Sequence, residues 1–431
     1  MTIFSVLCVF LALAAIVEYS IHLRTLRRIP VRIQVNGTRG KSTTTRLIAA
    51  GLRGAGLRVI AKTTGTAPSL ILEDGSEQLI KRRGRANISE QMRVARFAAS
   101  RGADAIVLEC MALEPENQWV AEHQMVRSTI GVITNVREDH LDVMGPTLRD
   151  VGEALALTVP RGGALVTAES EMLPIFEAAA RRLGAEVHVV DGSEIADEVN
   201  EEFEYVSFKE NVACALAACE LASVPRDVAL EGMLRAEGDP GAMRIIRVER
   251  NGLSYVVANA FAANDYTSTL MIWRMLTKRF EIVAEARAGQ ARPVRSGADR
   301  EAPGPRALHG TEAQAFATVR GGQNLPIAVV MNNRADRLPR IGELAPLVAQ
   351  VIQPAKVFLI GQAGRVAARR LAAAGVRGGC IIDLTSVADP EEVMQRIAES
   401  LPAGALLFAM GNTKGMGLTF ADYSERNGES L

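Results

Sequence analysis

The sequence has 431 residues, of which 49 are basic, 49 are acidic and 48% are hydrophobic. This length predicts two or three domains, and the balanced charge with only 4% aromatic residues disfavours nucleic acid as a partner. The five cysteines show neither a metal-binding spacing nor a small-domain disulfide framework, which is typical of a reducing compartment.

The N-terminus carries a run over residues 3–17 that is apolar except for Ser5, and basic residues follow it at Arg24, Arg27 and Arg28. The alternatives are a buried helix and a signal peptide, although a signal peptide would carry its positive charge before the apolar run. We expect a single membrane anchor over residues 1–23. By the positive-inside rule, the catalytic part of the chain then lies in the cytoplasm.

A strand, a glycine turn and a helix are predicted over residues 31–46. Apolar residues alternate with polar ones from Val31 to Val35, and a helical pattern begins at Ser42. Between and around them stand Gly37, Thr38, Arg39, Gly40, Lys41, Ser42 and Thr43. This layout is typical of a phosphate-binding loop, whose amides and lysine bind phosphate while its hydroxyl reaches Mg²⁺. The full Walker spacing would need glycine at Val35, so the motif is short and needs support from other segments.

The next segments alternate between strands and helices. Residues 57–62 predict a strand that continues into the polar segment 62–66, which is either a substrate-binding strand end or an ordinary turn. The basic run 81–85 is either a solvated loop or a contact for an anionic substrate. A helix is predicted over residues 87–101.

Two further predicted strands end in polar residues. Residues 105–108 are apolar and lead into Glu109, while residues 130–134 lead into Asn135 and then Asp139, His140 and Asp142. In a parallel sheet these strand ends share one edge with the loop. A carboxylate there can hold Mg²⁺ together with the loop hydroxyl, so we expect a metal and phosphate site.

The second half of the chain continues the α/β pattern. A turn signal at residues 239–241 places the boundary of two domains, 24–240 and 241–431. Residues 255–258, 327–331, 357–360, 379–382 and 406–410 predict buried parallel strands. Polar residues at 332–337 and at 411–415 follow two of them, and each group is either a surface loop or part of an active site. Residues 285–312 are rich in Ala, Arg, Gly and Pro, and we expect a flexible insertion there.

Taken together, these motifs resemble the Mur ligase family of ATP-dependent amide ligases, which includes muramyl-peptide and folylpolyglutamate synthetases. The resemblance is strongest to the membrane-anchored ligase subunit of poly-γ-glutamate (capsule) synthase. It rests on residues 37–42, 62–66, 109–111, 134–147, 239–244, 261–265 and 334–337. The fold that it implies has a P-loop-containing central α/β domain with a parallel sheet, a smaller C-terminal α/β nucleotide-fold domain and an N-terminal membrane helix.

The resemblance also implies site roles. Lys41 would hold the ATP phosphates. Ser42, Glu109 and His140 would ligate Mg²⁺, and Asn135 and Arg244 would contact the nucleotide, with Lys41, His140 and Arg244 as the catalytic set.

The chain departs from the family pattern in two ways. The chain has no lysine between Lys81 and Lys209, so the carbamylated lysine common in Mur ligases is absent or replaced. Asn259 stands where the family usually has an aspartate near the ribose, and Asp265 is a possible substitute.

The expected function is ATP-dependent ligation, in which a glutamate carboxylate at a chain end is activated as an acyl phosphate and joined to an amino group. Positioning and charge neutralisation suffice for such chemistry, and no nucleophilic side chain is needed. Expected partners are glutamate or a poly-γ-glutamate chain and the membrane subunits of a synthesis and export complex. The alternatives are a muramyl-peptide or folylpolyglutamate-type ligase, a P-loop kinase or regulatory ATPase of a membrane complex, and a non-catalytic ATP-binding scaffold.

Overall fold

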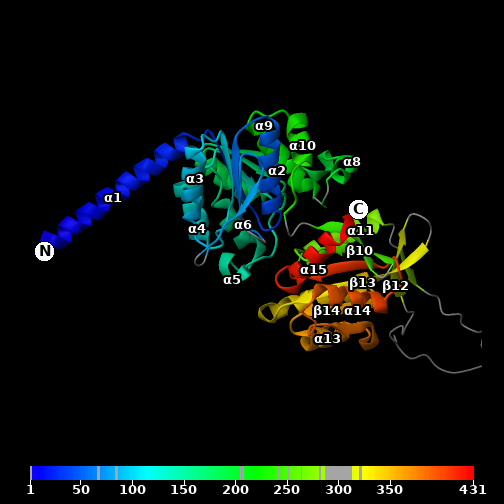
Figure 1. The fold of residues 1–431 in the computed structure, drawn as a ribbon. Coiled ribbons are helices and arrows are strands. Elements are labelled where there is room, and N and C mark those ends of the chain that lie inside the picture. The colour runs from blue at the N-terminus through cyan, green and yellow to red at the C-terminus, as the bar shows by residue number, and fades with distance from the viewer. Residues whose placement is uncertain are drawn as a thin grey trace, which may run out of the picture. The chain divides into compact units, whose positions relative to one another are not determined.

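The computed structural model describes residues 2–65, 68–82, 86–203, 205, 208–239, 243–250, 252–263, 265–280, 283–286, 313–319 and 323–431. The chain divides into two compact units, Met1–Pro240 and Gly241–Leu431, each built on its own sheet (Figure 1). The predicted insertion at 285–312 lies outside the described residues except for its first two positions. Thr66, residues 83–85 of the basic run and residues 240–242 at the expected boundary also lie outside them.

The first element is the helix α1 (Thr2–Arg27), which extends away from the rest of its unit (Figure 1). Its apolar side chains from Ile3 to Val17 are exposed, and the helix is long and apolar enough to cross a membrane. The helix runs past residue 23, and its last turn packs on the unit through the buried Leu26 and the following Ile29. Length and composition therefore allow a span that ends against the folded unit.

The first unit is built on a sheet with strand order β4-β3-β2-β5-β1-β6-β7-β8. The strands from β2 to β8 in that order are parallel, which confirms the predicted parallel α/β core, and the antiparallel strands β3 and β4 extend one edge. Their bounds are β1 (Val31–Asn36), β2 (Val59–Thr63), β3 (Ser69–Ile71), β4 (Glu77–Leu79), β5 (Ala105–Glu109), β6 (Ile130–Ile133), β7 (Ala164–Thr167) and β8 (Glu186–Val189). Residues 105–109 are buried throughout, as expected for a strand covered on both faces.

Helices cover both faces of this sheet. The helix α2 packs against α9 and α10, while α3 lies on the other side with α1 and η1 (Figure 1). Their bounds are α2 (Lys41–Gly54), α3 (Glu90–Ser100), α4 (Pro115–Val120), the π-helix η1 (Ala121–Val126), α5 (Leu141–Met144), α6 (Leu148–Ala156), α7 (Leu173–Leu183), η2 (Gly192–Glu194), α8 (Asp197–Glu201), α9 (Lys209–Leu221) and α10 (Arg226–Leu234). A capping box of Thr147 and Asp150 starts α6, where the polar loop after β6 ends.

The second unit contains the five parallel strands expected there, in the order β15-β14-β13-β16-β10. Antiparallel strands that the sequence patterns did not reveal extend this sheet on both sides. The bounds are β9 (Arg244–Arg250), β10 (Leu253–Asn259), β11 (Val283–Ala286), β12 (Ala313–Val319), β13 (Gln323–Asn333), β14 (Lys356–Gly361), β15 (Ile381–Asp383), β16 (Leu406–Gly411) and β17 (Gly428–Ser430). The helices are α11 (Tyr266–Arg279), η3 (Ala335–Arg337), α12 (Leu338–Pro346), η4 (Leu347–Ile352), α13 (Gly364–Ala373), η5 (Gly378–Cys380), α14 (Pro390–Ser400) and α15 (Met416–Arg426).

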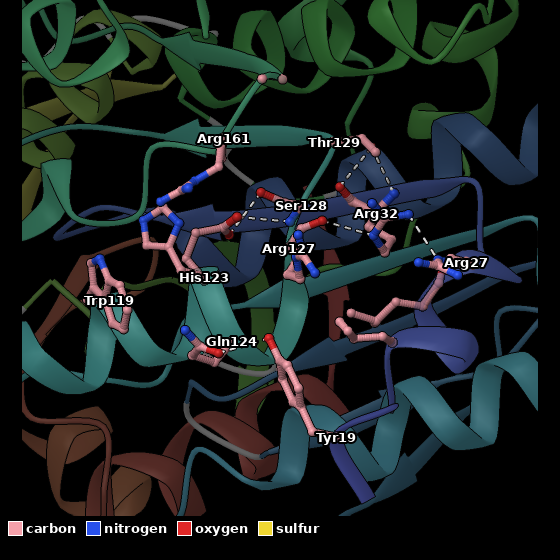
Figure 2. A pocket seen from close by; sticks show the side chains of 15 residues that line it. Tyr19, Arg27, Arg32, Trp119, His123, Gln124, Arg127, Ser128, Thr129 and Arg161 are labelled. Carbon is pink, nitrogen blue, oxygen red and sulfur yellow. Dashed lines mark hydrogen bonds between the residues drawn. The ribbon is translucent and has the colours of Figure 1, made fainter. Parts of the chain in front are cut away.

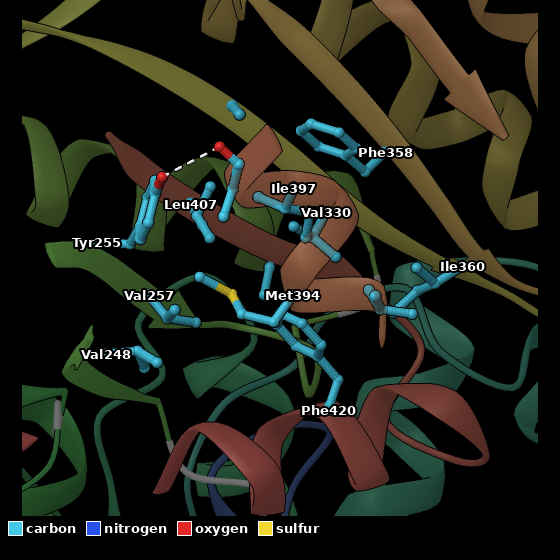
Figure 3. Close-up of a cluster of buried hydrophobic side chains, with 14 of the residues drawn as sticks. Val248, Tyr255, Val257, Val330, Phe358, Ile360, Met394, Ile397, Leu407 and Phe420 are labelled. Atoms are coloured by element: carbon cyan, nitrogen blue, oxygen red, sulfur yellow. Dashed lines mark hydrogen bonds between the residues drawn. The ribbon is translucent and has the colours of Figure 1, made fainter. Parts of the chain in front are cut away.

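The core of the second unit is aliphatic and aromatic. Met394 and Ile397 of α14 and Phe420 of α15 pack on the strands in one buried cluster (Figure 3). The phenol of Tyr255 is buried in this cluster and donates to the backbone carbonyls near the end of α14, at 3.2 and 3.3 Å. Its single polar atom is therefore satisfied, as a buried hydroxyl requires.

Candidate active site at the carboxyl edge of the first sheet

The glycine turn lies between β1 and α2 and depends on two glycines. Gly37 has φ of 125° and Gly40 has φ of 80°, a region that residues with a Cβ rarely adopt. A Cβ at Gly37 would overlap the Thr134 side chain, and a Cβ at Gly40 would overlap the side chain of Asn211. No side chain caps α2 at Gly40. The amides of its first turn therefore point into the turn and are suited to an anion.

Lys41 begins α2 and folds back over the turn. Its Nζ donates to the carbonyl oxygens of Gly37, at 2.6 Å, and Thr38, at 3.3 Å. The ammonium thus lies inside the ring of loop atoms instead of extending into solvent. A phosphate group bound at the α2 N-terminus would meet this fixed positive charge.

Thr134 and Asn135, which follow β6, hold the turn in place. The Asn135 Oδ1 accepts from the Thr38 hydroxyl, at 2.7 Å, and from the Arg39 amide, at 3.1 Å, while its Nδ2 donates to the Arg39 carbonyl, at 3.1 Å. The Thr134 hydroxyl donates to the same carbonyl at 2.6 Å. The resemblance implies a nucleotide contact for Asn135, and that role stays a prediction. The contacts in the structure make Asn135 a brace of the loop.

Glu109, at the end of β5, meets the loop from the other side. Because β5 and β6 flank β1, with Glu109 level with Val35, three strand ends converge on one edge. The Glu109 Oε2 accepts from the Ser42 hydroxyl, at 2.8 Å, and from the Thr64 amide, at 2.6 Å. The structure therefore brings together two predicted metal ligands that are 67 residues apart.

Ser42 and Glu109 fit a site for a magnesium ion that is bound together with phosphate. Among the described residues, no group of three or more His, Cys, Asp or Glu side chains is arranged to hold a metal by itself. Magnesium commonly uses one or two carboxylates and completes its shell with phosphate oxygens and water. The buried Glu109 carboxylate beside the Ser42 hydroxyl supplies that type of partial ligand set.

His140 lies in the loop after β6, in a left-handed backbone conformation with φ of 49°. Its Nε2 is 3.8 Å from the Asp139 carboxylate, and the same Asp139 oxygen is 3.7 Å from the Arg39 guanidinium. These contacts attach the predicted cluster 135–142 to the phosphate loop. A metal site shared by Glu109 and His140 stays a prediction.

A buried charge network was not foreseen from sequence. Lys62, at the end of β2, is fully buried, and its Nζ is 3.4 Å from Glu90 of α3. Glu90 also accepts two bonds from Arg82, at 2.7 and 3.0 Å. Burial lowers the pKa of Lys62. Burial opposes ionisation of Glu90 as well, but the Arg82 and Lys62 charges keep the pKa of Glu90 below its usual range. A lysine in an apolar strand was the sequence signal for a buried charge, but it could not identify the partner Glu90, which lies 28 residues further along the chain.

The remaining predicted residues belong to the second unit. Arg244 begins β9 and pairs with Glu425 at 2.6 Å, so its role at the nucleotide stays a prediction. The polar groups 332–337 and 411–415 do meet, because β13 and β16 are neighbours and Asn332 donates to the carbonyls of Asn412 and Lys414. Asp265 caps α11 by accepting from the Ser268 amide at 2.8 Å.

Comparison with known proteins supports the resemblance found in the sequence. Residues 35–225 match the Mur ligase middle domain, and residues 314–427 match the poly-gamma-glutamate synthase CapB C-terminal domain. The chain is 44% identical over 273 residues to the capsule biosynthesis protein CapB of Bacillus anthracis, covering 63% of this chain and 59% of that protein. It is 36% identical over 357 residues to the PGA synthase CapB of Bacillus subtilis strain 168, covering 82% and 80%.

Solved structures share the fold. A bifunctional folylpolyglutamate synthase/dihydrofolate synthase from Yersinia pestis, complexed with AMPPNP and Mn ion, has a TM-score of 0.62 at 16% identity, covering 95% of this chain and 92% of that one. A bifunctional synthase of the same kind with Mn, AMPPNP and L-glutamate bound has a TM-score of 0.57 at 16% identity, covering 95% and 92%. The predicted α/β architecture is thereby confirmed.

Proposed function

The chain belongs to the CapB poly-γ-glutamate synthase family, whose members carry a Mur ligase middle domain, and we propose on that basis that it is an ATP-dependent ligase that extends a poly-γ-glutamate chain. In this proposal a glutamate carboxylate attacks the γ-phosphorus of ATP, ADP leaves, and an acyl phosphate forms. The amine of the next unit then attacks the acyl carbon, inorganic phosphate leaves, and the nitrogen loses a proton as the amide forms.

The observation that carries the proposal is the convergence at the ends of β5, β1 and β6. The α2 N-terminus and Lys41 provide the positive field for the transferred phosphoryl group, because the charge that moves in such a reaction sits on phosphate oxygens. Magnesium, when bound, neutralises phosphate charge. Ser42 and Glu109, with His140 as a third proposed ligand, are the residues that would hold it.

The phosphate-binding geometry supports a nucleotide, and similar proteins support both a nucleotide and an amino acid. A synthase of the same fold was crystallised with AMPPNP, Mn and L-glutamate, and the B. subtilis relative is described as a PGA synthase. A single-pass membrane location with the catalytic part in the cytoplasm, and association with membrane subunits of a synthesis and export complex, are part of the proposal. They are supported by the apolar length of α1 and by the arginines that follow it.

The test is the Lys41→Ala variant in full-length protein. Wild type should release phosphate from ATP when glutamate and a short γ-linked acceptor are present, and lengthened acceptor should accumulate in equal amount. Lys41→Ala should lose at least about 10²-fold in rate, because the phosphoryl group loses its fixed counter-charge. Arg182→Ala, which removes an exposed positive charge in the last turn of α7 in the same unit, is the matched control and should keep the wild-type rate.

Two outcomes would contradict the proposal. Full ligation by Lys41→Ala would remove the loop from the reaction. Phosphate release that needs neither glutamate nor acceptor, with no lengthened product, would favour the regulatory ATPase alternative.

The membrane anchor is tested separately by deletion. A chain lacking residues 2–17 should leave the membrane fraction, and its retention there would place the anchor elsewhere.

A further inference from the structure

A cavity of about 570 Å³ lies at the end of α1, far from the candidate active site. It is lined by the last turns of α1, by β1 near its start, by α4 and η1, and by the turn before β7 (Figure 2). These segments mark the amino edge of the sheet, whereas the phosphate loop follows the carboxyl end of β1. The six residues of β1 separate the two edges by about 20 Å, at about 3.3 Å per residue. The cavity is therefore a separate site.

The lining is strongly basic. It includes four arginines and a single carboxyl group, Glu122. Arg127 lies between Arg161 on one side and Arg27 with Arg32 on the other (Figure 2). The Arg32 side chain is already hydrogen-bonded within the protein, because its guanidinium donates to the carbonyls of Ile29, at 2.8 Å, and Arg127, at 2.9 Å. The side chains of the other three arginines are exposed and have no hydrogen bond or ion pair within the part of the chain that the structure describes.

The acidic and imidazole groups of the lining do not cancel this charge. The carboxyl of Glu122 is buried and turned to Ser128, whose amide and hydroxyl donate to it at 2.9 Å each. Burial raises the pKa of Glu122 to about 7. Burial and the charges of Arg161 and Arg127 lower the pKa of His123. At neutral pH the cavity consequently holds an excess of positive charge without a counter-ion from the protein.

The position of the cavity relative to α1 indicates what the counter-ion is. Apart from Ser5, the side chains from Ile3 to Val17 are apolar and exposed, whereas further along the helix His22 and Leu26 are buried against the unit. The Tyr19 hydroxyl donates to Gln124 at 2.9 Å, and the His22 ring bonds to the Met125 carbonyl at 2.8 Å. From Tyr19 to Arg27 the helix rises about 12 Å, which is enough to cross a headgroup layer of about 5 to 8 Å.

Aromatic residues support this placement. Tyr19 and Trp119 line the cavity and are each about 40% exposed, and such side chains gather at membrane interfaces. We propose that this cavity binds the phosphate headgroup of an anionic phospholipid, with Arg27, Arg127 and Arg161 as its ligands. Guanidinium groups bind phosphate oxygens through paired N–H donors. The inference rests on the membrane anchorage in the proposed function. It adds a lipid site that would fix the orientation of the unit on the bilayer.

Trp119 makes the site measurable in the full chain. The second of the two tryptophans, Trp273, is buried in the other unit, and Trp273→Phe leaves Trp119 as the sole emitter. In neutral detergent, this protein is titrated with dioleoyl phosphatidylglycerol and, separately, with dioleoyl phosphatidylcholine. Trp119 fluorescence is recorded, and lipid phosphorus per protein is counted after gel filtration. Phosphatidylglycerol should saturate the signal at a concentration at least tenfold below phosphatidylcholine and leave about one phosphorus per chain.

Two pairs of substitutions separate a built site from general attraction to the membrane. Arg127→Gly with Arg161→Gln should raise the half-saturating concentration at least tenfold. The glycine suits the left-handed backbone at Arg127, where φ is 48°, so folding should be retained. Arg24→Gln with Arg28→Gln removes two exposed arginines near the same helix end but outside the lining, and should change the value less than twofold.

Several outcomes would overturn the lipid assignment. The first is that both pairs of substitutions weaken lipid binding equally, and the second is that the two lipids bind equally well. The others are that neither measurement detects binding, and that millimolar inorganic phosphate or poly-γ-glutamate displaces the lipid. Ligation is measured on the same preparations. Lipid binding without ligation would refute the proposed function alone, and ligation without lipid binding would refute this inference alone.

Discussion

The brace formed by Asn135 gives the sharpest quantitative test of the active-site geometry. Asn135→Ala removes three side-chain hydrogen bonds to Thr38 and Arg39 but keeps the backbone bond from the Thr38 amide to the Asn135 carbonyl, at 3.1 Å. At about 0.5–1.5 kcal/mol for each bond, the upper limit of the loss is about 4.5 kcal/mol. Because Asn135 is only half-buried and water can replace part of these bonds, we expect a loss of about 1.5–3 kcal/mol in the unliganded protein.

The same loss should appear in nucleotide binding. If the loop must be ordered again when ATP binds, a cost of about 1.5–3 kcal/mol corresponds to a rise in KM for ATP of roughly 10- to 150-fold. Asn135→Asp keeps both accepted bonds but turns a negative oxygen toward the Arg39 carbonyl and the phosphate site. It should therefore cost less stability than Asn135→Ala and weaken ATP binding at least as much.

The assay combines two measurements on each variant. Urea unfolding is followed by Trp119 fluorescence in the Trp273→Phe background, since Trp119 reports on the first unit, and initial rates are measured over a range of ATP concentrations. Asn117→Ala is the matched control, because Asn117 makes a single exposed bond to Glu114, and it should change stability by less than about 0.5 kcal/mol. A raised KM for ATP in Asn135→Ala with unchanged stability of the unliganded protein would refute the brace and indicate direct contact with the nucleotide.

Three further predictions concern the buried carboxyl groups of Glu122 and Glu90 and the glycine turn at Gly40. Burial raises the pKa of Glu122 from 4.5 to about 7. The folded state therefore favours the protonated carboxyl, and this contribution to the free energy of unfolding is fully present below about pH 4.5 and is lost as the pH rises through 7. The loss is about 3 kcal/mol, and urea midpoints at pH 5 and pH 8 should show this slope in wild type and not in Glu122→Gln. Glu90→Gln leaves the Lys62 ammonium without its carboxylate and should lower the free energy of unfolding by about 3–5 kcal/mol in the same assay. Adding Lys62→Met to Glu90→Gln should restore part of this loss, whereas additive losses would contradict the pairing. Gly40→Ala should lower ligation at least tenfold, because its Cβ would displace Asn211 and strain the turn, and a wild-type rate would show that the turn tolerates another backbone.

The sequence by itself determined the local part of the site. The alternation from Val31 to Val35, the glycines at 37 and 40 and the helical pattern after Ser42 predicted the strand, turn and helix that the structure contains. These signals are local, because side-chain period and backbone freedom depend on adjacent residues. The motifs were also sufficient for the family resemblance, which the comparisons confirm.

Only the tertiary structure decided which distant groups meet. Glu109 reaches Ser42, and Asn135 braces Arg39, because β5 and β6 lie on either side of β1. The edge strands β3 and β4 are short and lack a strong period, so their pairing and the position of Glu77 beside Arg46 had no sequence signal. The basic cavity is assembled from segments up to 144 residues apart, between Tyr19 and Gly163. Hydrogen bonds and charge pairs act over a few ångströms in space, and the order of strands in a sheet, which sets those distances, is not encoded in the period of any one segment.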